Sequence, residues 1–500
     1  MNKSYIRYVV GFCVMLEGAF LLLSAFVGAF YLDKEVFVYL ACGGIYLAIG
    51  LLSYFKKPKN NVFFLKDGFM MVALSWVVLS ILGAIPFVIT KEIPSFIDAL
   101  FETASGFTTT GSTILNDVEH LSHTSMFWRL FTHWIGGMGI LVFVLMILPT
   151  AGGYSINILK AESPGPEVDR IVSRVRDSAK WLYSIYIIMT LIEMVLLFIS
   201  GMNLFDSVVL SFATAGTGGF GVLNSSFGSY TALQQMIAAV FMMLFGVNFN
   251  IYYGAFVAKS KDVLKSEELK VYLALVFGAT LLIGINILGY YNNGFNAFKD
   301  AFFQVTSIIS STGFSSTDFN MWPAFSKTLL VTLMFIGAMA GSTGGGIKVS
   351  RIIMIVKDAF RNVQLCLHPR KVELVTLDGK KVKNEVIRNV KSYIGIYACV
   401  YIVSLLIISL DGFDYTTNFT AVIATLNNIG PGLNIVGPAG NFSQFSDLSK
   451  LVLTFDMIAG RLELIPMFVL ITPLFELRKS KKFVKDLFKD DKQVESQVEY

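Results

Sequence analysis

The sequence predicts an all-α integral membrane protein, and three features support this fold class: the composition, the long apolar segments and a repeated short motif. Of its 500 residues, 54% are hydrophobic and 15% are charged, whereas soluble domains carry about 25% charged residues. A helix needs roughly 20 apolar residues to cross about 30 Å of hydrocarbon. We therefore predict about ten transmembrane helices, in segments 8–32, 36–55, 69–90, 127–149, 181–200, 232–258, 271–290, 328–356, 392–410 and 448–475.

The distribution of positive charge predicts the orientation of these helices. Cytoplasmic loops carry an excess of Lys and Arg. If the N-terminus is inside, 32 of the 40 Lys and Arg residues are cytoplasmic, in the N-terminus, 56–66, 160–180, 259–270, 351–391 and 478–492. We therefore expect both termini in the cytoplasm and membrane lipid around the helices. Topology accounts for the basic clusters, so no nucleic-acid partner is expected.

After an N-terminal helix pair, the chain repeats one unit four times: a long apolar helix, a short amphiphilic segment, a glycine-containing turn and another long helix. The short segments align without gaps, and in each an Asp or Thr stands 13 positions before a glycine. They read DALFETASGFTTTG (98–111), DSVVLSFATAGTGG (206–219), DAFFQVTSIISSTG (300–313) and TNFTAVIATLNNIG (417–430). A repeat of this kind predicts fourfold pseudo-symmetry.

The spacing within this unit predicts four half-spanning pore helices. Asp or Thr is a good N-cap, and nine or ten helical residues rise about 15 Å, which is too short to span. Such a segment can return only where its non-helical end is buried in protein or lines a water-filled cavity. Its C-terminal end carries negative partial charge, which favours a cation. Four glycine turns would add rings of backbone carbonyls, which replace the water around a dehydrated potassium ion.

One further expectation and one alternative interpretation concern these segments. The Asp residues that begin three of them would lie on the outer side and enrich cations at the mouth. Gly, Ser and Thr also form ordinary contacts between membrane helices, which is the alternative interpretation of a single such turn. Four turns at one spacing favour the pore.

Two glycine-rich stretches resemble nucleotide-binding motifs without fitting them. Residues 216–221, GTGGFG, follow a short helix rather than the strand that a dinucleotide motif requires. Residues 341–348, GSTGGGIK, miss a phosphate loop by one position, because Ile347 separates Gly346 from Lys348. We expect no organic cofactor. Since irregular backbone at membrane depth should line a cavity, 341–348 is interpreted as a movable gate below the filter, with a kink without function as the alternative.

Other polar residues point to transport rather than catalysis. Arg461 lies within the last apolar segment, and a charge in that setting indicates function or an ion pair. We interpret it as an electrostatic barrier near the conduction path, and a structural pair with Asp456 or Glu463 is the alternative. No catalytic constellation is recognisable, so the chain is not expected to be an enzyme.

The stretch VELVTLDGKKV alternates around Asp378-Gly379 and predicts a hairpin. We interpret this hairpin as a docking element for a soluble partner, with a solvated spacer as the alternative.

Seven further stretches lie between residues 101 and 463 and read FETASGFTTTGST, HWIGGMGI, AESPGP, SSTGFSS, GAMAGSTGGGIKVSR, LNNIGPGLN and GRLE. Together they resemble the TrkH branch of the bacterial Trk/Ktr potassium transporters, which are relatives of the plant HKT transporters. The extra helix pair before the first repeat fits this branch.

The resemblance implies a site at named positions. The family's filter glycines would be Gly111, Gly219, Gly313 and Gly430, and the first is serine in some sodium-preferring relatives. The second repeat departs most from the pattern, since it reads GTGGF where the first reads TTTGS. The expected filter is Thr110, Gly111, Gly218, Gly219, Thr312, Gly313, Ile429 and Gly430, with K+ held at Thr110, Gly111, Gly219, Thr312, Gly313 and Gly430. The expected gating residues are Gly341, Ser342, Thr343, Gly344, Gly345, Gly346, Lys348 and Arg461.

The resemblance also implies an assembly and a function. A potassium-selective subunit of an uptake system is expected in the bacterial inner membrane, as a homodimer on a cytosolic, nucleotide-binding ring similar to TrkA. A secondary transporter with alternating access, coupled to protons or sodium, is the alternative. Such transporters usually consist of two inverted halves, whereas this chain has four units in one orientation.

The expected organisation follows the repeats. It comprises an N-terminal helix pair (1–60), a first repeat (61–160), a second (161–265), a third with the glycine-rich loop (266–360), a cytoplasmic hairpin-like connection (361–390), a fourth repeat (391–480) and a cytoplasmic tail (481–500).

Overall fold

The computed structural model describes residues 2–56, 58, 65–139, 175–257, 263, 265–370 and 373–470. The AESPGP turn, the last ten residues of the predicted fourth repeat and the predicted tail lie outside these ranges. Within them the chain is helical apart from one short hairpin and connecting turns, which confirms the predicted all-α class.

Six continuous helices in the described part of the chain are long and apolar enough to cross a membrane. Each falls on a predicted segment. They are α1 (Lys3–Phe30), α2 (Val36–Phe55), α3 (Leu65–Thr90), α8 (Val175–Ile199), α12 (Glu267–Ile287) and α16 (Asn384–Ile408).

In the described part of the other four predicted segments, the helices are shorter or broken. A pair bends by 90° near Asn248 and counts as a seventh span if taken as one. The predicted segment 328–356 is interrupted at Gly337, where the helix ends. Gly337 has a φ of 73°, a conformation that only glycine adopts readily. The helices are α5 (His123–Gly137), α10 (Ala232–Phe245) with α11 (Phe249–Tyr252) and a π-helical turn (Tyr253–Val257), α14 (Ala324–Ile336) with α15 (Val349–Leu367), and α18 (Asp447–Arg461).

Four short helices occupy the predicted pore-helix segments. All four of their starting residues were predicted wrongly as N-caps. In three helices the cap lies three positions upstream, where Ser95, Asn203 and Asp414 accept from the backbone N–H of Asp98, Asp206 and Thr417. In the third repeat the cap is Asn293, and Asp300 lies inside the helix. The helices are therefore 12 to 16 residues long: α4 (Phe96–Phe107), α9 (Leu204–Gly216), α13 (Gly294–Ile309) and α17 (Tyr415–Leu426).

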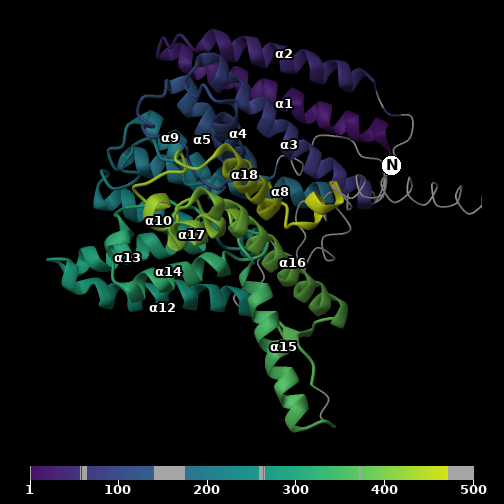
Figure 1. The fold of residues 1–500 in the computed structure, drawn as a ribbon, viewed down its shortest axis with the longest axis vertical. Helices are drawn as coiled ribbons and strands as arrows, with labels where there is room; N and C mark the ends of the chain where they lie inside the picture. The colour runs from purple at the N-terminus through teal and green to yellow at the C-terminus, as the bar shows by residue number, and fades with distance from the viewer. Residues whose placement is uncertain are drawn as a thin grey trace, which may run out of the picture.

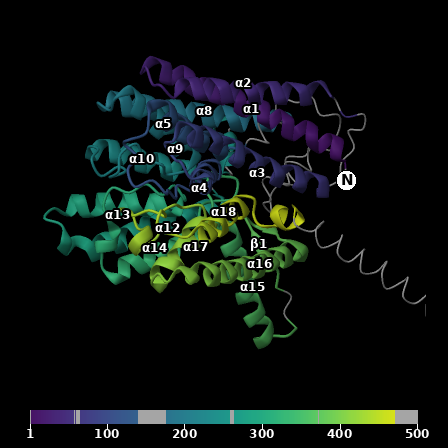
Figure 2. The ribbon, with the colours of Figure 1, turned by 45° about the horizontal axis from the view of Figure 1, so that its top comes forward.

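The longer helices surround these short ones. Figure 1 shows α1 and α2 along one edge of the bundle, and α12, α13 and α14 along the opposite edge. Figure 2, turned by 45°, again shows α4 between α1 and α2 on one side and α12, α13 and α14 on the other. Short 3-10 turns complete the described connections at Leu288–Tyr290, Phe319–Met321, Ser409–Asp411 and Asn434–Val436.

The predicted hairpin is present. Strand β1 (Thr376–Leu377) pairs antiparallel with β2 (Lys380–Lys381). Asp378 and Gly379 between them both have positive φ, as a type I′ turn requires. Helix α15 continues to Leu367, seven residues into the predicted connection, and extends away from the bundle (Figure 1).

Candidate functional site

All four pore helices end in the same way. The residue two positions before each predicted filter glycine is left-handed: Thr109, Thr217, Ser311 and Asn428 have φ between 54° and 59°. The next residue then donates its N–H to the carbonyl five positions back, as in a Schellman motif. These bonds are Thr110 N to Ser105 O at 2.9 Å, and Gly218 N to Ala213 O, Thr312 N to Ser307 O and Ile429 N to Ala424 O at 2.8 Å.

Each predicted filter glycine follows directly and also has positive φ: 83° at Gly111, 81° at Gly219, 88° at Gly313 and 98° at Gly430. In each turn, two residues with positive φ are separated by one residue and follow directly after the helix end. This conformation explains why the sequence places glycine at the second position, where a side chain would be strained. The internal repeat is therefore matched by repeated backbone geometry.

The four turns form a closed ring. A Cβ added to Gly111 would lie 2.2 Å from the carbonyl oxygen of Gly218. One added to Gly219 would lie 2.0 Å from Thr312 O, and one on Gly313 would lie 1.8 Å from Ile429 O. The last, on Gly430, would lie 2.8 Å from Thr110 O. Each glycine thus packs against the residue before the next glycine, in the order first, second, third, fourth, first. The structure brings all eight predicted filter residues together.

Side chains make this ring less than fourfold symmetric. Hydroxyl pairs at 2.7 Å join Thr108 to Thr110 in the first turn and Ser310 to Thr312 in the third. Asn428 Nδ2 donates to Thr110 Oγ1 at 2.9 Å and so connects the fourth turn to the first. The backbone of the four turns is therefore more symmetric than the side-chain hydrogen bonds around it.

The predicted gating loop packs directly against two of the turns. The Gly345 N–H donates to Ser311 Oγ. A Cβ on Gly344 would lie 2.6 Å from Ser310 O, and one on Gly345 would lie 2.4 Å from Asn427 O. Only glycine permits so close an approach of one backbone to another.

Two cations hold this loop in position. Lys348 has a φ of 83°, and its Nζ donates to the carbonyls of Gly344 and Gly345. Arg461, half-buried, donates to Thr343 O at 2.7 Å and to the carbonyls of Gly136 and Gly137 at 2.6 and 2.7 Å. The residues predicted as a gate therefore form one connected group.

The carboxylates weighed as partners of Arg461 are engaged elsewhere. Glu463 forms an ion pair with Arg351, and Asp456 accepts from Ser404 Oγ at 2.8 Å.

Sequence reasoning missed several residues of this site. Ser311 and Asn428 were detectable, because they share the position two before the filter glycine. Glu268 gave no local signal: it lies at the start of an apolar helix, is 6% exposed, and accepts from the N–H groups of Ala340 at 2.8 Å and Ser350 at 3.0 Å. It connects α12 to both ends of the loop.

The Asp residues that were expected to attract cations at the outer mouth are partly paired with lysines. Lys450 Nζ lies 2.5 Å from Asp98, and Lys299 Nζ lies 3.0 Å from Asp300, so two of the three expected attractive charges are offset. Asp414, outside the helices, keeps its charge readily, because the hydrogen bond from the Thr417 side chain holds its pKa below the usual range.

Comparison with known proteins gives consistent results. The TrkH family, described as a cation transport protein, matches residues 37–482. The chain is 34% identical over 485 residues to the Trk system potassium uptake protein TrkH of Escherichia coli (strain K12), covering 95% of this chain and 99% of that protein. It is 30% identical over 485 residues to the Trk system potassium uptake protein TrkG of the same organism, with the same coverage. The crystal structure of the potassium transporter TrkH from Vibrio parahaemolyticus matches with a TM-score of 0.84 at 32% identity, covering 95% of this chain and all of that one.

Proposed function

The chain belongs to the TrkH family of cation transport proteins, and we propose that it is the potassium-selective, ion-conducting subunit of a Trk-type uptake system. Its family is one of membrane transporters, so its activity is transport and not enzymatic catalysis. The driving force would be the membrane potential, worth about 2.3 kcal/mol per charge per 100 mV.

The observation that carries this proposal is the closed ring of four turns. Each turn contributes two adjacent residues whose backbone reverses next to the following turn. Carbonyl oxygens in such rings can replace the hydration shell of potassium, and the C-terminal ends of four converging helices favour a cation nearby. We propose that Thr110, Gly218, Thr312 and Ile429, each with its following glycine, form the filter.

The proposed gate is the loop from Gly341 to Gly346 with Lys348 and Arg461. In this arrangement the loop contacts the third and fourth turns and is held by hydrogen bonds from both cations. Conduction would require the loop to move, and Arg461 would repel a cation on the same path.

The proposed setting follows the relatives, which are named as parts of a Trk system. We propose a homodimer in a bacterial inner membrane, with both termini cytoplasmic and a TrkA-like cytosolic ring as the nucleotide-binding partner. The seven-part organisation given above remains part of this proposal, and the hairpin at Thr376–Lys381 is its proposed docking element.

The direct test is flux of potassium and sodium into proteoliposomes that contain only this purified chain, under an inside-negative potential. Potassium flux well above sodium flux would support the selective pore. Equal fluxes would contradict the selectivity. Flux that requires an imposed proton or sodium gradient would point to the secondary transporter instead. If neither ion moves, adding the cytosolic ring separates a closed gate from a wrong assignment.

Ser311→Ala is expected to raise potassium flux by a few-fold. The substitution removes the acceptor of the Gly345 N–H, and one hydrogen bond contributes about 1 kcal/mol, which is about fivefold in the equilibrium between closed and open loop. Flux in proteoliposomes measures the change. Ser315→Ala, outside the loop contacts, is the matched control, and an unchanged rate in Ser311→Ala would contradict the role of this bond.

A further inference from the structure

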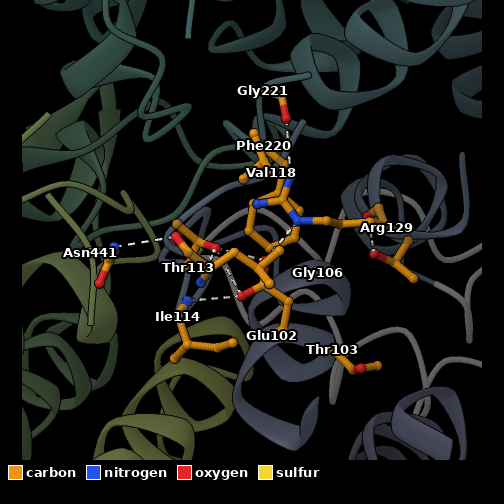
Figure 3. A network of polar contacts seen from close by, with 12 residues as sticks. Glu102, Thr103, Gly106, Thr113, Ile114, Val118, Arg129, Phe220, Gly221 and Asn441 are labelled. Carbon is orange, nitrogen blue, oxygen red and sulfur yellow. Dashed lines mark hydrogen bonds and ion pairs between the residues drawn. The ribbon is translucent and has the colours of Figure 1, made fainter. Parts of the chain in front are cut away.

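A buried ion pair lies behind the ring of turns, outside the residues assigned to filter and gate. Glu102 is on α4 and Arg129 is on α5, and their side chains are 0% and 2% exposed. Arg129 Nε donates to Glu102 Oε1 at 2.6 Å. Figure 3 shows the two side chains pointing toward one another, between the segments that carry Ile114 and Gly221.

Glu102 holds the segment that leaves the first turn. Thr113 Oγ1 donates to both carboxylate oxygens, at 2.9 and 3.0 Å, and the Ile114 N–H donates to Oε2 at 3.0 Å. Thr113 is two residues after Gly111. One carboxylate on the pore helix therefore sets the path of the chain directly beyond the first filter glycine.

Arg129 holds the corresponding segment of the second turn. Its NH1 donates to the carbonyl of Gly221 at 3.0 Å, two residues after Gly219. Its guanidinium carbon lies 3.6 Å from the ring centroid of Phe220, a cation–π contact. The ion pair thus connects the segment after the first turn to the segment after the second turn, and these two segments lie far apart in the sequence.

Stability alone does not account for this pair. Burying an ion pair costs desolvation energy, and apolar residues of similar volume often serve as well. The chain itself demonstrates the apolar solution, because the positions equivalent to Glu102 are Leu210 in the second repeat and Ala421 in the fourth. The third has Gln304, which donates to Thr317 O at 3.4 Å. Unlike an apolar pair, Glu102 and Arg129 form hydrogen bonds to the segments that follow the first and second filter glycines.

We propose that Glu102 and Arg129 are positioning residues for ion selectivity, which hold the first and second turns at the spacing that suits potassium. This inference rests on the proposed function of the ring. The pair contacts the segments after Gly111 and Gly219, so it acts on the ion through the backbone. Its bonds also supply a side-chain connection between the first and second turns, as Asn428 does between the fourth and the first.

Two substitutions test the proposal without leaving a buried charge uncompensated. Arg129→Lys keeps the positive charge beside Glu102, but a single ammonium lacks the planar fork that reaches Glu102 and Gly221 together. Thr113→Val keeps the shape of the side chain and removes its donation to Glu102. We expect the potassium-to-sodium flux ratio to fall about tenfold in the first and about threefold in the second, since bonds to charged groups are among the stronger ones.

The flux ratio separates positioning from folding, because loss of folded protein lowers both fluxes together. Thr103→Val is the matched control: its hydroxyl donates to Ala99 O within α4, at the residue next to Glu102, and it should keep the wild-type ratio. If the unaltered protein is selective and both Arg129→Lys and Thr113→Val keep its flux ratio, this inference is wrong, while the proposed function stands. An unselective wild type would instead overturn the proposed function.

Discussion

Replacing Gly313 with alanine is expected to remove most of the discrimination between potassium and sodium while leaving the helices folded. The glycine has a φ of 88°, and a Cβ there would lie 1.8 Å from the carbonyl oxygen of Ile429. The left-handed conformation costs other residues about 1–2 kcal/mol. The overlap adds to this cost, since the carbonyl that must move belongs to the proposed filter itself. A potassium-to-sodium flux ratio reduced at least tenfold is expected, and Gly313→Asp should be at least as severe.

The expected loss of selectivity differs between the filter glycines, because a Cβ at each would overlap its neighbour to a different degree. A Cβ at Gly430 would lie 2.8 Å from Thr110 O, which is a milder overlap than the 1.8 Å at Gly313. Gly430→Ala should therefore lose less selectivity. Gly395→Ala is the matched control, because nothing lies within 4 Å of a Cβ built there. Unchanged discrimination against sodium in Gly313→Ala would remove this glycine from the filter.

Replacing Arg461 with glutamine is expected to speed potassium transport. The change removes a positive charge from the group below the ring and weakens the bonds that hold the loop at Thr343 and α5 at Gly136. Two unit charges about 8 Å apart at an effective dielectric constant of about 20 repel by about 2 kcal/mol, which corresponds to roughly thirtyfold in rate. Initial potassium flux at fixed potential measures the effect.

Arg461→Lys separates charge from loop contacts. Lysine keeps the charge but cannot form the same set of bonds to three carbonyls, so the barrier predicts a rate close to wild type. A rate in Arg461→Lys as high as in Arg461→Gln would assign the effect to the loop contacts. A misfolded or unaltered Arg461→Gln protein would favour a structural role for the arginine.

The main elements of the fold were predictable because each depends on local physics. A helix must satisfy its backbone groups within the membrane, so apolar length alone located α1, α2, α3, α8, α12 and α16. The repeat located the four pore helices by a 13-residue spacing. The Asp378-Gly379 turn was equally local. The caps were misassigned, because Ser95, Asn203 and Asp414 lie upstream of the aligned segments.

The support of the ring was not predictable in the same way. Glu102 and Arg129 are 27 positions apart, and Ser311 and Gly345 are 34 apart. Asn428 and Thr110 are 318 apart. No periodicity relates such residues, and charged or hydroxyl side chains in apolar segments do not indicate their partners. The partners emerged only when the four turns were placed around one ring.

The sequence by itself determined the all-α membrane class, the four repeats and the glycines, because chain length, apolar content and backbone conformation are properties of short segments. Only the tertiary structure decided that Gly111, Gly219, Gly313 and Gly430 each pack against the next turn, and that Arg461 connects the loop to α5. The physical reason is that hydrogen bonds and close backbone contacts depend on distances between segments, which the order of residues does not state.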